Sequence, residues 1–383
     1  MPSQKGTVFP RKKIATRVKH RILQNYLKAW GGIIVTSNRG RPVRLAFVDT
    51  CCGSGLYAPN DVEPDAGYDV GSALIGIEVL SNLLAYGASV GGEVTAKALF
   101  INENAAELDT LRAAIAQHSH APIPFQILSH RLEDVVEDVA SFCHNHFTFL
   151  FIDPYGPSAI PFSVVSRLVQ LKFADCLVNF PYYSIHKWVG WLDSGEQEAR
   201  LAIVDALLNG AAWRDIARRH RHSRPALEEA ILDHYMNQLA GLGLAAFALP
   251  MSFEDRKRTL YHLVFTSRNT AGLAAAKKEL QDAEAYQAAL KAELKAAKQH
   301  QGLLDFMAAD AAPADPVDIE SLACDIHAHF HARSVTVDDV IRYALFKPHV
   351  LDSHVRKAFT RLKKAGLAHT TGTRYHDTIK FAS

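Results

Sequence analysis

The chain has 383 residues, of which 48% are apolar and 21% charged, and its formal net charge is +2. This composition predicts a globular protein with a large core. A net charge this small excludes nucleic-acid binding that is driven by overall charge alone. The length indicates two domains. We find no apolar stretch long enough to span a bilayer, and residues 1–21 are basic without a hydrophobic centre, so neither a membrane segment nor a signal peptide is expected.

Five cysteines stand at positions 51, 52, 143, 176 and 324, and no two of them form a CxxC pair. Most lie in apolar runs, which is typical of reduced thiols that fill a core. The sequence therefore favours a cytoplasmic protein without a disulfide framework or a metal site.

The N-terminal segment, residues 1–43, is basic and contains one predicted helix. Apolar residues recur at helical spacing over residues 15–33, while Lys19 and His20 fall on another side, facing either a polyanion or solvent. Basic clusters at 11–13, 17–21 and 218–224 are more often solvated faces than binding sites. Three of them in a nearly neutral chain favour a local patch that binds nucleic acid, with Lys19, His20, Arg219 and Arg221 as candidates.

A short buried strand over residues 45–49 ends in Asp49 and is followed by a glycine loop of the form D-x-x-x-G-x-G. Gly53 and Gly55 let the backbone pass close to a ligand, and the acid can accept an ammonium or hydroxyl group. Methyltransferases hold S-adenosylmethionine in this way. A glycine turn without special purpose fits the same residues.

The next elements continue an α/β alternation. Residues 56–70 form a polar insertion, either a lid or a passive loop, before a helix over 71–86 with Ser72 as its expected N-cap. A strand over 96–103 ends in Glu103, placed to accept ribose hydroxyls. A third strand covers 124–128, and Leu132, where the next helix opens, is a further cofactor-binding candidate; which residue there meets the adenine amino group stays open.

The apolar run 147–152 predicts a buried strand that ends in Asp153-Pro154-Tyr155-Gly156. Asp153 offers a carboxylate, and Pro154 fixes the direction of the preceding carbonyl. Two acceptors aimed at one spot suit an exocyclic amino group of a base. Tyr155 offers a flat face on which that base can stack, and Gly156 lets the substrate come close to the backbone. The turn resembles the (D/N)PP(Y/F) motif of amino-group methyltransferases without its second proline. Asp-Pro-x-Gly is also a common way for a strand to turn.

Beyond this turn, a helix over 161–171 leads to a strand over 174–180. Tyr182, which follows it, is either a core residue or part of a base pocket beside Tyr155. Residues 194–242 read as an inserted helical subdomain. Two apolar strands over 244–249 and 260–265 flank a short polar loop and predict an antiparallel hairpin. A doubly wound sheet that ends in a hairpin is the methyltransferase form and disfavours a nicotinamide-binding fold.

The remaining chain divides into a long helix and linker, residues 271–315, and a predicted winged-helix domain, residues 316–383. Three helices and a β-turn support the latter. Its third helix carries basic residues, including Lys357 and Arg361, of the types that bind a phosphate backbone. Winged helices also serve as protein docking modules, so both roles stay open.

The motifs in their order along residues 15–290 resemble the three-Cys-motif partner family, TcmP. The resemblance rests on Lys19-His20, Phe47-Val48-Asp49, Gly71-Ser72-Ala73-Leu74, Ile101-Asn102-Glu103 and Phe151-Ile152-Asp153-Pro154-Tyr155-Gly156. Members usually have Phe-Ala-Gly-Pro-Gly where this chain has Cys51-Cys52-Gly53-Ser54-Gly55. The resemblance implies a methyltransferase-like fold and a partner that carries the three-cysteine motif.

Together these features predict a seven-stranded, Rossmann-like domain over residues 44–270 that depends on S-adenosylmethionine. Its expected reaction is methylation of an exocyclic amine of a base, in RNA more than in DNA. The alternative is a catalytically inactive protein that keeps the methyltransferase fold and binds nucleic acid or a partner.

Overall fold

The computed structural model describes residues 10, 12–58, 69–118, 123–194, 197–253, 258–299, 317–347 and 349–382. The chain forms two compact units, Met1–Arg268 and Asn269–Ser383. The predicted linker over residues 308–315 and the basic residue Arg11 lie outside the described residues.

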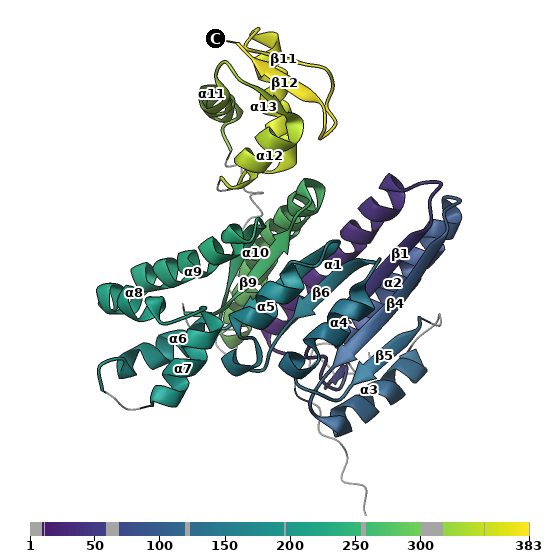
Figure 1. Ribbon diagram of the computed structural model, residues 1–383, viewed down its shortest axis with the longest axis vertical. Coiled ribbons are helices and arrows are strands. Elements are labelled where there is room, and N and C mark those ends of the chain that lie inside the picture. Colours follow the sequence, from purple (N-terminus) through teal and green to yellow (C-terminus); the bar gives the residue numbers. More distant parts are fainter. Residues whose placement is uncertain are drawn as a thin grey trace, which may run out of the picture. The chain divides into compact units, whose positions relative to one another are not determined.

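The first unit is built on a seven-stranded sheet (Figure 1). Its strands are β1 (Val43–Asp49), β4 (Val94–Ile101), β5 (Phe125–Leu128), β6 (Phe147–Ile152), β7 (Ala174–Phe180), β8 (Ala245–Ser252) and β9 (Thr259–Ser267). The spatial order is β5-β4-β1-β6-β7-β9-β8. The strands from β5 to β7 pair in parallel, whereas β9 runs antiparallel to both β7 and β8. The predicted mostly parallel sheet ending in a hairpin is therefore confirmed.

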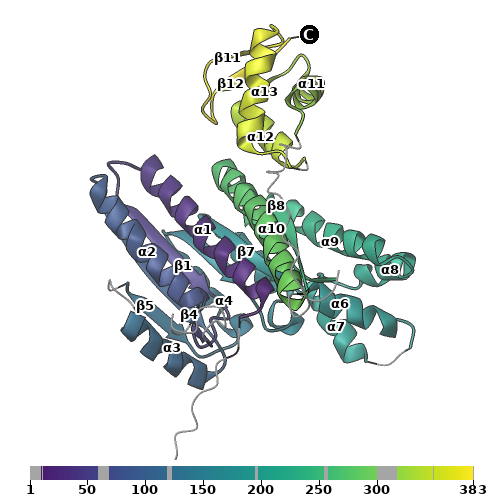
Figure 2. The same ribbon diagram turned by 180° about the vertical axis from the view of Figure 1, so that it is seen from behind.

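Helices cover both faces of this sheet. One face carries α1 (Ile14–Ser37) and α2 (Ser72–Ser89), which pack side by side, as Figure 2 shows. The other carries α4 (Val136–Cys143) and α5 (Phe162–Val169), visible in front of the sheet in Figure 1. Along the chain, α3 (Ala105–His118) connects β4 to β5, and the short 3-10 helix η2 (Leu132–Asp134) precedes α4. Because side chains alternate along a strand, each strand supplies apolar residues to both layers.

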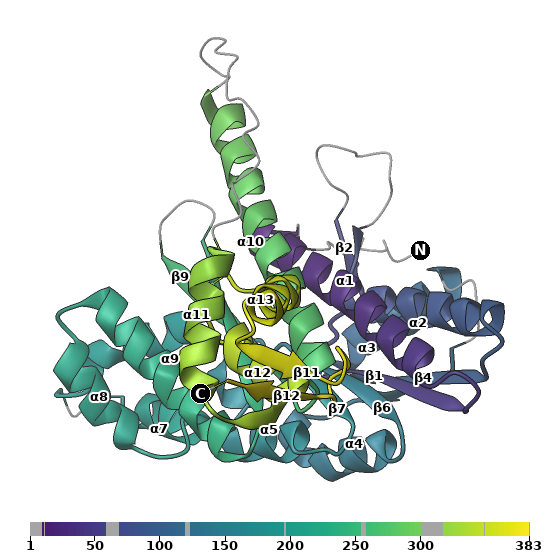
Figure 3. The same cartoon turned by 90° about the horizontal axis from the view of Figure 1, so that it is seen from above.

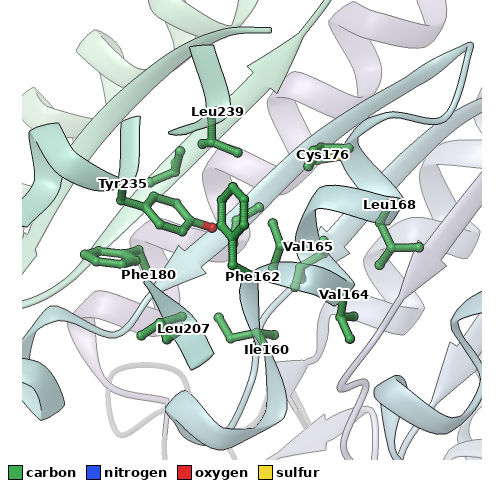
Figure 4. Packing of buried hydrophobic residues seen from close by; sticks show 14 of the residues in the cluster. Ile160, Phe162, Val164, Val165, Leu168, Cys176, Phe180, Leu207, Tyr235 and Leu239 are labelled. Atoms are coloured by element: carbon green, nitrogen blue, oxygen red, sulfur yellow. The ribbon is translucent and has the colours of Figure 1, made fainter. Parts of the chain in front are cut away.

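The helical segment after β7 belongs to the same core. It comprises α6 (Tyr182–Trp188), α7 (Glu198–Leu207), α8 (Ala212–His220) and α9 (Arg224–Gly241). Tyr235 of α9 stacks on Phe180 at 4.5 Å between ring centroids and meets Phe162 edge-on at 5.9 Å (Figure 4). The inserted helical subdomain expected over 194–242 is not confirmed, since its helices share one apolar core with β7 and β8.

The second unit contains α10 (Thr270–Gln299), α11 (Ile319–Phe330), α12 (Val337–Leu345) and α13 (Asp352–Lys364). The same unit contains a three-stranded antiparallel sheet, in which β12 (Thr378–Phe381) lies between β10 (Ser334–Thr336) and β11 (Ala368–Thr370). In Figure 3, β11 and β12 lie side by side, and α13 packs on β11. The winged-helix assignment of these elements stays a prediction.

Two sequence expectations about α2 need correction. The helix is long and apolar enough by composition to cross a membrane, although no such stretch was identified from the sequence; 56% of it is buried, and it packs on α1, β1 and β4 as a core helix does. Its N-cap is Gly71, not Ser72. Ser72 is the first helical residue, and its side chain acts on the pKa of Asp49.

Candidate functional site at the carboxyl edge of the sheet

The loop after β1 is fastened to the ends of both neighbouring strands. In the sheet register, Asp49 lies between Phe100 of β4 and Phe151 of β6. The Thr50 N–H then donates to the Phe151 carbonyl at 3.0 Å, and the Cys52 N–H donates to the Ile101 carbonyl at 3.1 Å. The residues that follow these three strands therefore leave the sheet at one edge, where open α/β sheets bind ligands.

Asp49 is fully buried and only partly hydrogen-bonded. Its Oδ1 accepts from the Cys51 N–H at 3.3 Å, whereas Oδ2 has no partner within the described part of the chain. The pKa of Asp49 is raised to about 7, mainly by burial and also by the negative charge of Asp153, while the interaction with Ser72 lowers it. A buried carboxylate oxygen without a partner is costly, so a cation or an N–H donor placed there would be stabilised.

The glycine loop has the backbone geometry that the sequence predicts. Gly53 and Gly55 have φ angles of +57° and +76°, which glycine adopts without steric cost. The Gly71 N–H donates to the Gly55 carbonyl at 2.7 Å, so the loop closes directly against the start of α2. A Cβ on Gly55 would lie 2.5 Å from Cδ1 of Leu111, while a Cβ on Gly53 would meet only the Tyr155 hydroxyl at 3.3 Å.

The end of β4 differs from the expected arrangement. The strand ends at Ile101, two residues earlier than predicted, and Glu103 is exposed. Asn102 is buried, and its Nδ2 donates to Oε2 of Glu107 at 2.6 Å. Tyr155 also donates to that oxygen, at 3.1 Å. Asn102 and Glu107 therefore link this strand end to the turn after β6, a role that the sequence reasoning missed because it followed only the first acid after the strand.

Leu132, the further cofactor-binding candidate, is 4% exposed in η2. It belongs to the apolar cluster that includes Ile101 and Ile152, the last residues of β4 and β6. Its side chain therefore packs in the core beneath the edge. In contrast, Glu133 is partly exposed and forms an ion pair with Arg131 at 2.8 Å.

Asp153 makes two polar contacts, one through each carboxylate oxygen. Nδ2 of Asn179, on β7, donates to its Oδ1 at 2.7 Å, and the Lys19 ammonium of α1 donates to its Oδ2. The side chains of Lys19 and Asp153 are only 9% and 17% exposed, so the ion pair is largely desolvated. Lys19 does not face a polyanion or bulk solvent; it is an internal counter-ion for Asp153.

His20 is buried as well, at 5% exposure, which corrects the expectation that it faces solvent or a polyanion. Its Nδ1 has no partner among the described residues, and burial together with the charges of Lys12 and Lys19 lowers its pKa well below the usual value. Its ring meets Tyr57 edge-on at 5.7 Å. His20 is therefore a neutral imidazole that packs against the start of the 56–70 insertion.

The two ends of that insertion lie next to the site. They pair as β2 (Leu56–Tyr57) and β3 (Asp69–Val70), and Lys12 holds them by donating to Asp69 Oδ1 at 2.7 Å and to the Val70 carbonyl at 2.8 Å. Burial raises the pKa of Tyr57, and the charges of Asp153 and Asp49 raise it further, so its hydroxyl lies near both acids. Residues 59–68, the rest of the expected lid or loop, lie outside the described residues.

The aromatic candidates separate. Tyr155 is 71% exposed, which leaves its ring available for stacking. Tyr182 is 2% exposed, and its ring lies 5.8 Å from His262 and 6.0 Å from His186. Of the two roles considered for Tyr182, the structure shows the core residue. Gly156 has extended backbone with open space where a Cβ would stand, so close packing does not require glycine there.

The basic candidates on helices are exposed but partly neutralised. Arg221 forms an ion pair with Asp193, and Nε of Arg219 donates to the Asp215 carbonyl at 3.3 Å. In the second unit, Lys357 and Arg361 are exposed on α13, and Arg361 lies 3.2 Å from Glu320. Exposed pairs of this kind contribute little to stability and leave the cations accessible.

The cysteines near the site are poor nucleophiles. The pKa of the Cys51 thiol is raised to about 12, mainly by burial and also by the negative charges of Asp153 and Asp49. Cys52 is buried, and its pKa is also raised by burial. Both are therefore neutral loop residues, because the thiolate is the reactive form. Among the residues that the structure describes, no cluster of His, Cys, Asp and Glu suits a metal ion.

Comparison with known proteins finds no matching family model and no matching curated protein. Solved structures give distant likenesses. Protein LPL1258 from Legionella pneumophila has 11% identity and a TM-score of 0.36, covering 67% of this chain and 86% of its own. A candidate caffeoyl-CoA O-methyltransferase from Staphylococcus aureus has 11% identity and a TM-score of 0.29, covering 63% and 82%. Loganic acid methyltransferase with SAH has 9% identity and a TM-score of 0.25, covering 94% of both chains.

Proposed function

We propose that this protein transfers a methyl group from S-adenosylmethionine to an exocyclic amine of a nucleic-acid base, in RNA more than in DNA. The observation that carries this proposal is the pair of acids at one sheet edge. Asp49 is buried with an unpartnered oxygen beside the glycine loop, and Asp153 follows the adjacent strand. The strand order and the antiparallel β9 support the same class of protein.

The residues at the end of β1 fit an amino-acid cofactor. The unpartnered Oδ2 of Asp49 would accept from an ammonium group, and Gly53, which has no side chain, lets the backbone come close to a ligand. Glu103 is exposed at the next strand end, where a carboxylate accepts ribose hydroxyls. S-adenosylmethionine, when bound, supplies an electrophilic methyl group on a sulfonium.

The residues after β6 would hold the acceptor. The Asp153 backbone carbonyl, directed by Pro154, and the polar groups around its side chain orient the amine, while the exposed ring of Tyr155 stacks on the base. A strong general base is not needed, because the amine proton can leave late, to Asp153 or to water. A target within a duplex has to be flipped out of the stack first.

Affinity for nucleic acid would come from elsewhere in the chain. Arg219 and Arg221 in the first unit and Lys357 and Arg361 on α13 supply exposed cations for phosphates. We read the second unit as a winged helix in this role. A three-Cys-motif protein is the partner that the family resemblance suggests, and a cytoplasmic location agrees with five free thiols.

A second candidate function is a binding protein that keeps the fold as a scaffold. Two features favour it. Both oxygens of Asp153 are already engaged by Lys19 and Asn179, and Cys51-Cys52 replaces the residues usual before the loop glycines. In this case the protein binds nucleic acid without cofactor.

One experiment separates the two candidates. The purified protein is incubated with tritiated S-adenosylmethionine and total RNA or DNA, and the nucleosides released by digestion are analysed by mass spectrometry. A methylated exocyclic amine that requires the protein supports the enzyme. Nucleic-acid binding without cofactor binding or transfer supports the scaffold.

A further inference from the structure

Asn179 is the polar residue that the sequence reasoning left without a role. It stands next to the end of β7, and its Nδ2 lies 2.7 Å from Oδ1 of Asp153. A carboxylate can only accept hydrogen bonds, so the amide must present its NH2 group to Asp153. The orientation of the amide is therefore fixed by chemistry, and its oxygen points away from the carboxylate.

That oxygen is a buried acceptor without a donor. Asn179 is 8% exposed, and its Oδ1 has no partner among the residues that the structure describes. Asp175, Leu177 and Asn179 are alternate residues of β7, so their side chains lie on the same face of the strand. On that face, Asp175 accepts a hydrogen bond from the Tyr26 hydroxyl of α1. Asn179 thus faces the α1 side of the sheet, as Lys19 does. An unpaired buried carbonyl is unfavourable, which points to a donor that arrives with a ligand.

The surroundings suit an amine. The Lys19 ammonium beside Asp153 lies 5.9 Å from the ring centroid of Phe151 and 5.7 Å from that of Tyr261. Aromatic faces and a carboxylate together favour a cation, and Lys19 is the cation that they surround here. Both Asp153 oxygens are engaged, whereas the Asn179 oxygen has no donor among the described residues.

We propose that Asn179 Oδ1 accepts a hydrogen bond from the acceptor amine and thereby selects bases that carry an exocyclic NH2 group. This inference rests on the proposed function and assigns separate roles to the residues that hold the acceptor. Asn179 contacts the amine, whereas Asp153 and Lys19 position Asn179. The oxygen is buried in the free protein, so a covering side chain has to move for the amine to enter.

The test measures binding of fluorescein-labelled octauridine and of its variants with one central adenosine, cytidine, guanosine or inosine. Uracil and hypoxanthine carry no exocyclic amine, and inosine keeps the purine ring. Fluorescence anisotropy is recorded with and without S-adenosylhomocysteine, so that no transfer occurs. Wild-type protein is expected to bind at least one amine-bearing oligonucleotide about tenfold more tightly than octauridine and the inosine variant.

Two substitutions separate contact from positioning. Asn179→Leu keeps the size and removes both polar groups, and the amine preference should disappear. Asn179→Asp keeps an acceptor oxygen but loses the donor to Asp153, so the preference should persist. A residue that only anchors Asp153 would behave in the opposite way, with Asn179→Asp at least as harmful as Asn179→Leu. Thermal unfolding confirms that each variant is folded.

The outcomes are decisive. Preference in wild type and Asn179→Asp, with loss in Asn179→Leu, supports the inference. Preference retained by Asn179→Leu overturns it, as does a wild type that binds all five oligonucleotides equally. Failure of methyl transfer or cofactor binding refutes the proposed enzyme instead, because the amine preference is measured without transfer and also without cofactor.

Discussion

Asp49 and Asp153 lie at the same edge of the sheet, yet their surroundings are opposite. Asp49 is fully buried, keeps one oxygen without a partner and has a pKa raised to about 7. Asp153 is paired with an ammonium and an amide, both from other elements. The first site lacks a cation that a ligand can supply, whereas the second is completed by the chain itself.

The largest expected effect comes from Asp153→Ala. It leaves the Lys19 ammonium buried without a counter-ion, so the free energy of unfolding should fall by about 3 kcal/mol. Methyl transfer should drop at least about 100-fold, because the amine is no longer oriented, while cofactor affinity stays nearly unchanged. Denaturant unfolding and tritium transfer measure the two effects.

The double variant Lys19→Met/Asp153→Ala is the matched control. It removes both charges and should recover most of the stability without recovering transfer. Restored transfer in the double variant would show that Asp153 has no role beyond balancing Lys19.

Asp49→Asn should act in the opposite sense on stability. It removes a buried charge that has no counter-ion and keeps the size of the side chain, so the free protein should be at least as stable as wild type above pH 7. Affinity for S-adenosylmethionine should fall about 30-fold, since a charge-assisted hydrogen bond contributes about 2 kcal/mol. A loss of stability like that of Asp153→Ala would contradict the contrast between the two acids.

The two loop glycines offer a smaller test of the cofactor side. Gly55→Ala combines a positive φ with a Cβ only 2.5 Å from Leu111, whereas Gly53→Ala meets only the Tyr155 hydroxyl at 3.3 Å. Gly53→Ala should cost about 1 kcal/mol of stability from backbone strain alone, and Gly55→Ala clearly more. Thermal unfolding of the two variants checks the order, and equal losses would exclude packing against Leu111 as a factor.

The smallest effect is on pH dependence. The folded-state pKa of Asp49 is about 7, above its ordinary value of 3.8, chiefly because of burial. The proton is held more tightly in the folded state, so its contribution to stability is full below about pH 4 and is lost as the pH rises through 7. A cationic ligand requires the ionised acid, so cofactor affinity should rise by at most about tenfold per pH unit towards pH 7.

Above pH 7 the affinity should level and then decline as the ligand's own amine loses its proton, near about pH 8. Calorimetric titrations between pH 5.5 and 8.5 measure the profile, with Asp49→Asn as the control that lacks the rise. An unchanged rise in Asp49→Asn would assign the titration to another group.

The sequence predicts the sheet well because its signals are local. The apolar runs that lead to Asp49 and Asp153 are strands, which end at Asp49 and at Ile152. The hairpin formed by β8 and β9 follows from two apolar runs around a polar loop. The place of α9 was not predicted, because helical periodicity does not say which surface a helix covers. Only the structure shows Tyr235 on Phe180.

The sequence predicted the site residues that follow the strand ends. It did not predict the contacts that join those residues to other elements. Asp49, Gly53 and Asp153 were found because each follows a strand in a recognisable turn. The contacts of Lys19 and Asn179 with Asp153 span 134 and 26 positions, and no local pattern reports them. Lys19 was instead assigned to a polyanion, since a lysine within a basic cluster is usually solvated.

The most direct test of the central claim is a calorimetric titration of the wild-type protein with S-adenosylmethionine near pH 7.5, repeated with Asp49→Asn and Asp153→Ala. We predict binding to wild type, similar binding to Asp153→Ala and about 30-fold weaker binding to Asp49→Asn. No binding to wild type, or equal binding to wild type and Asp49→Asn, would contradict the assignment of this edge to the cofactor.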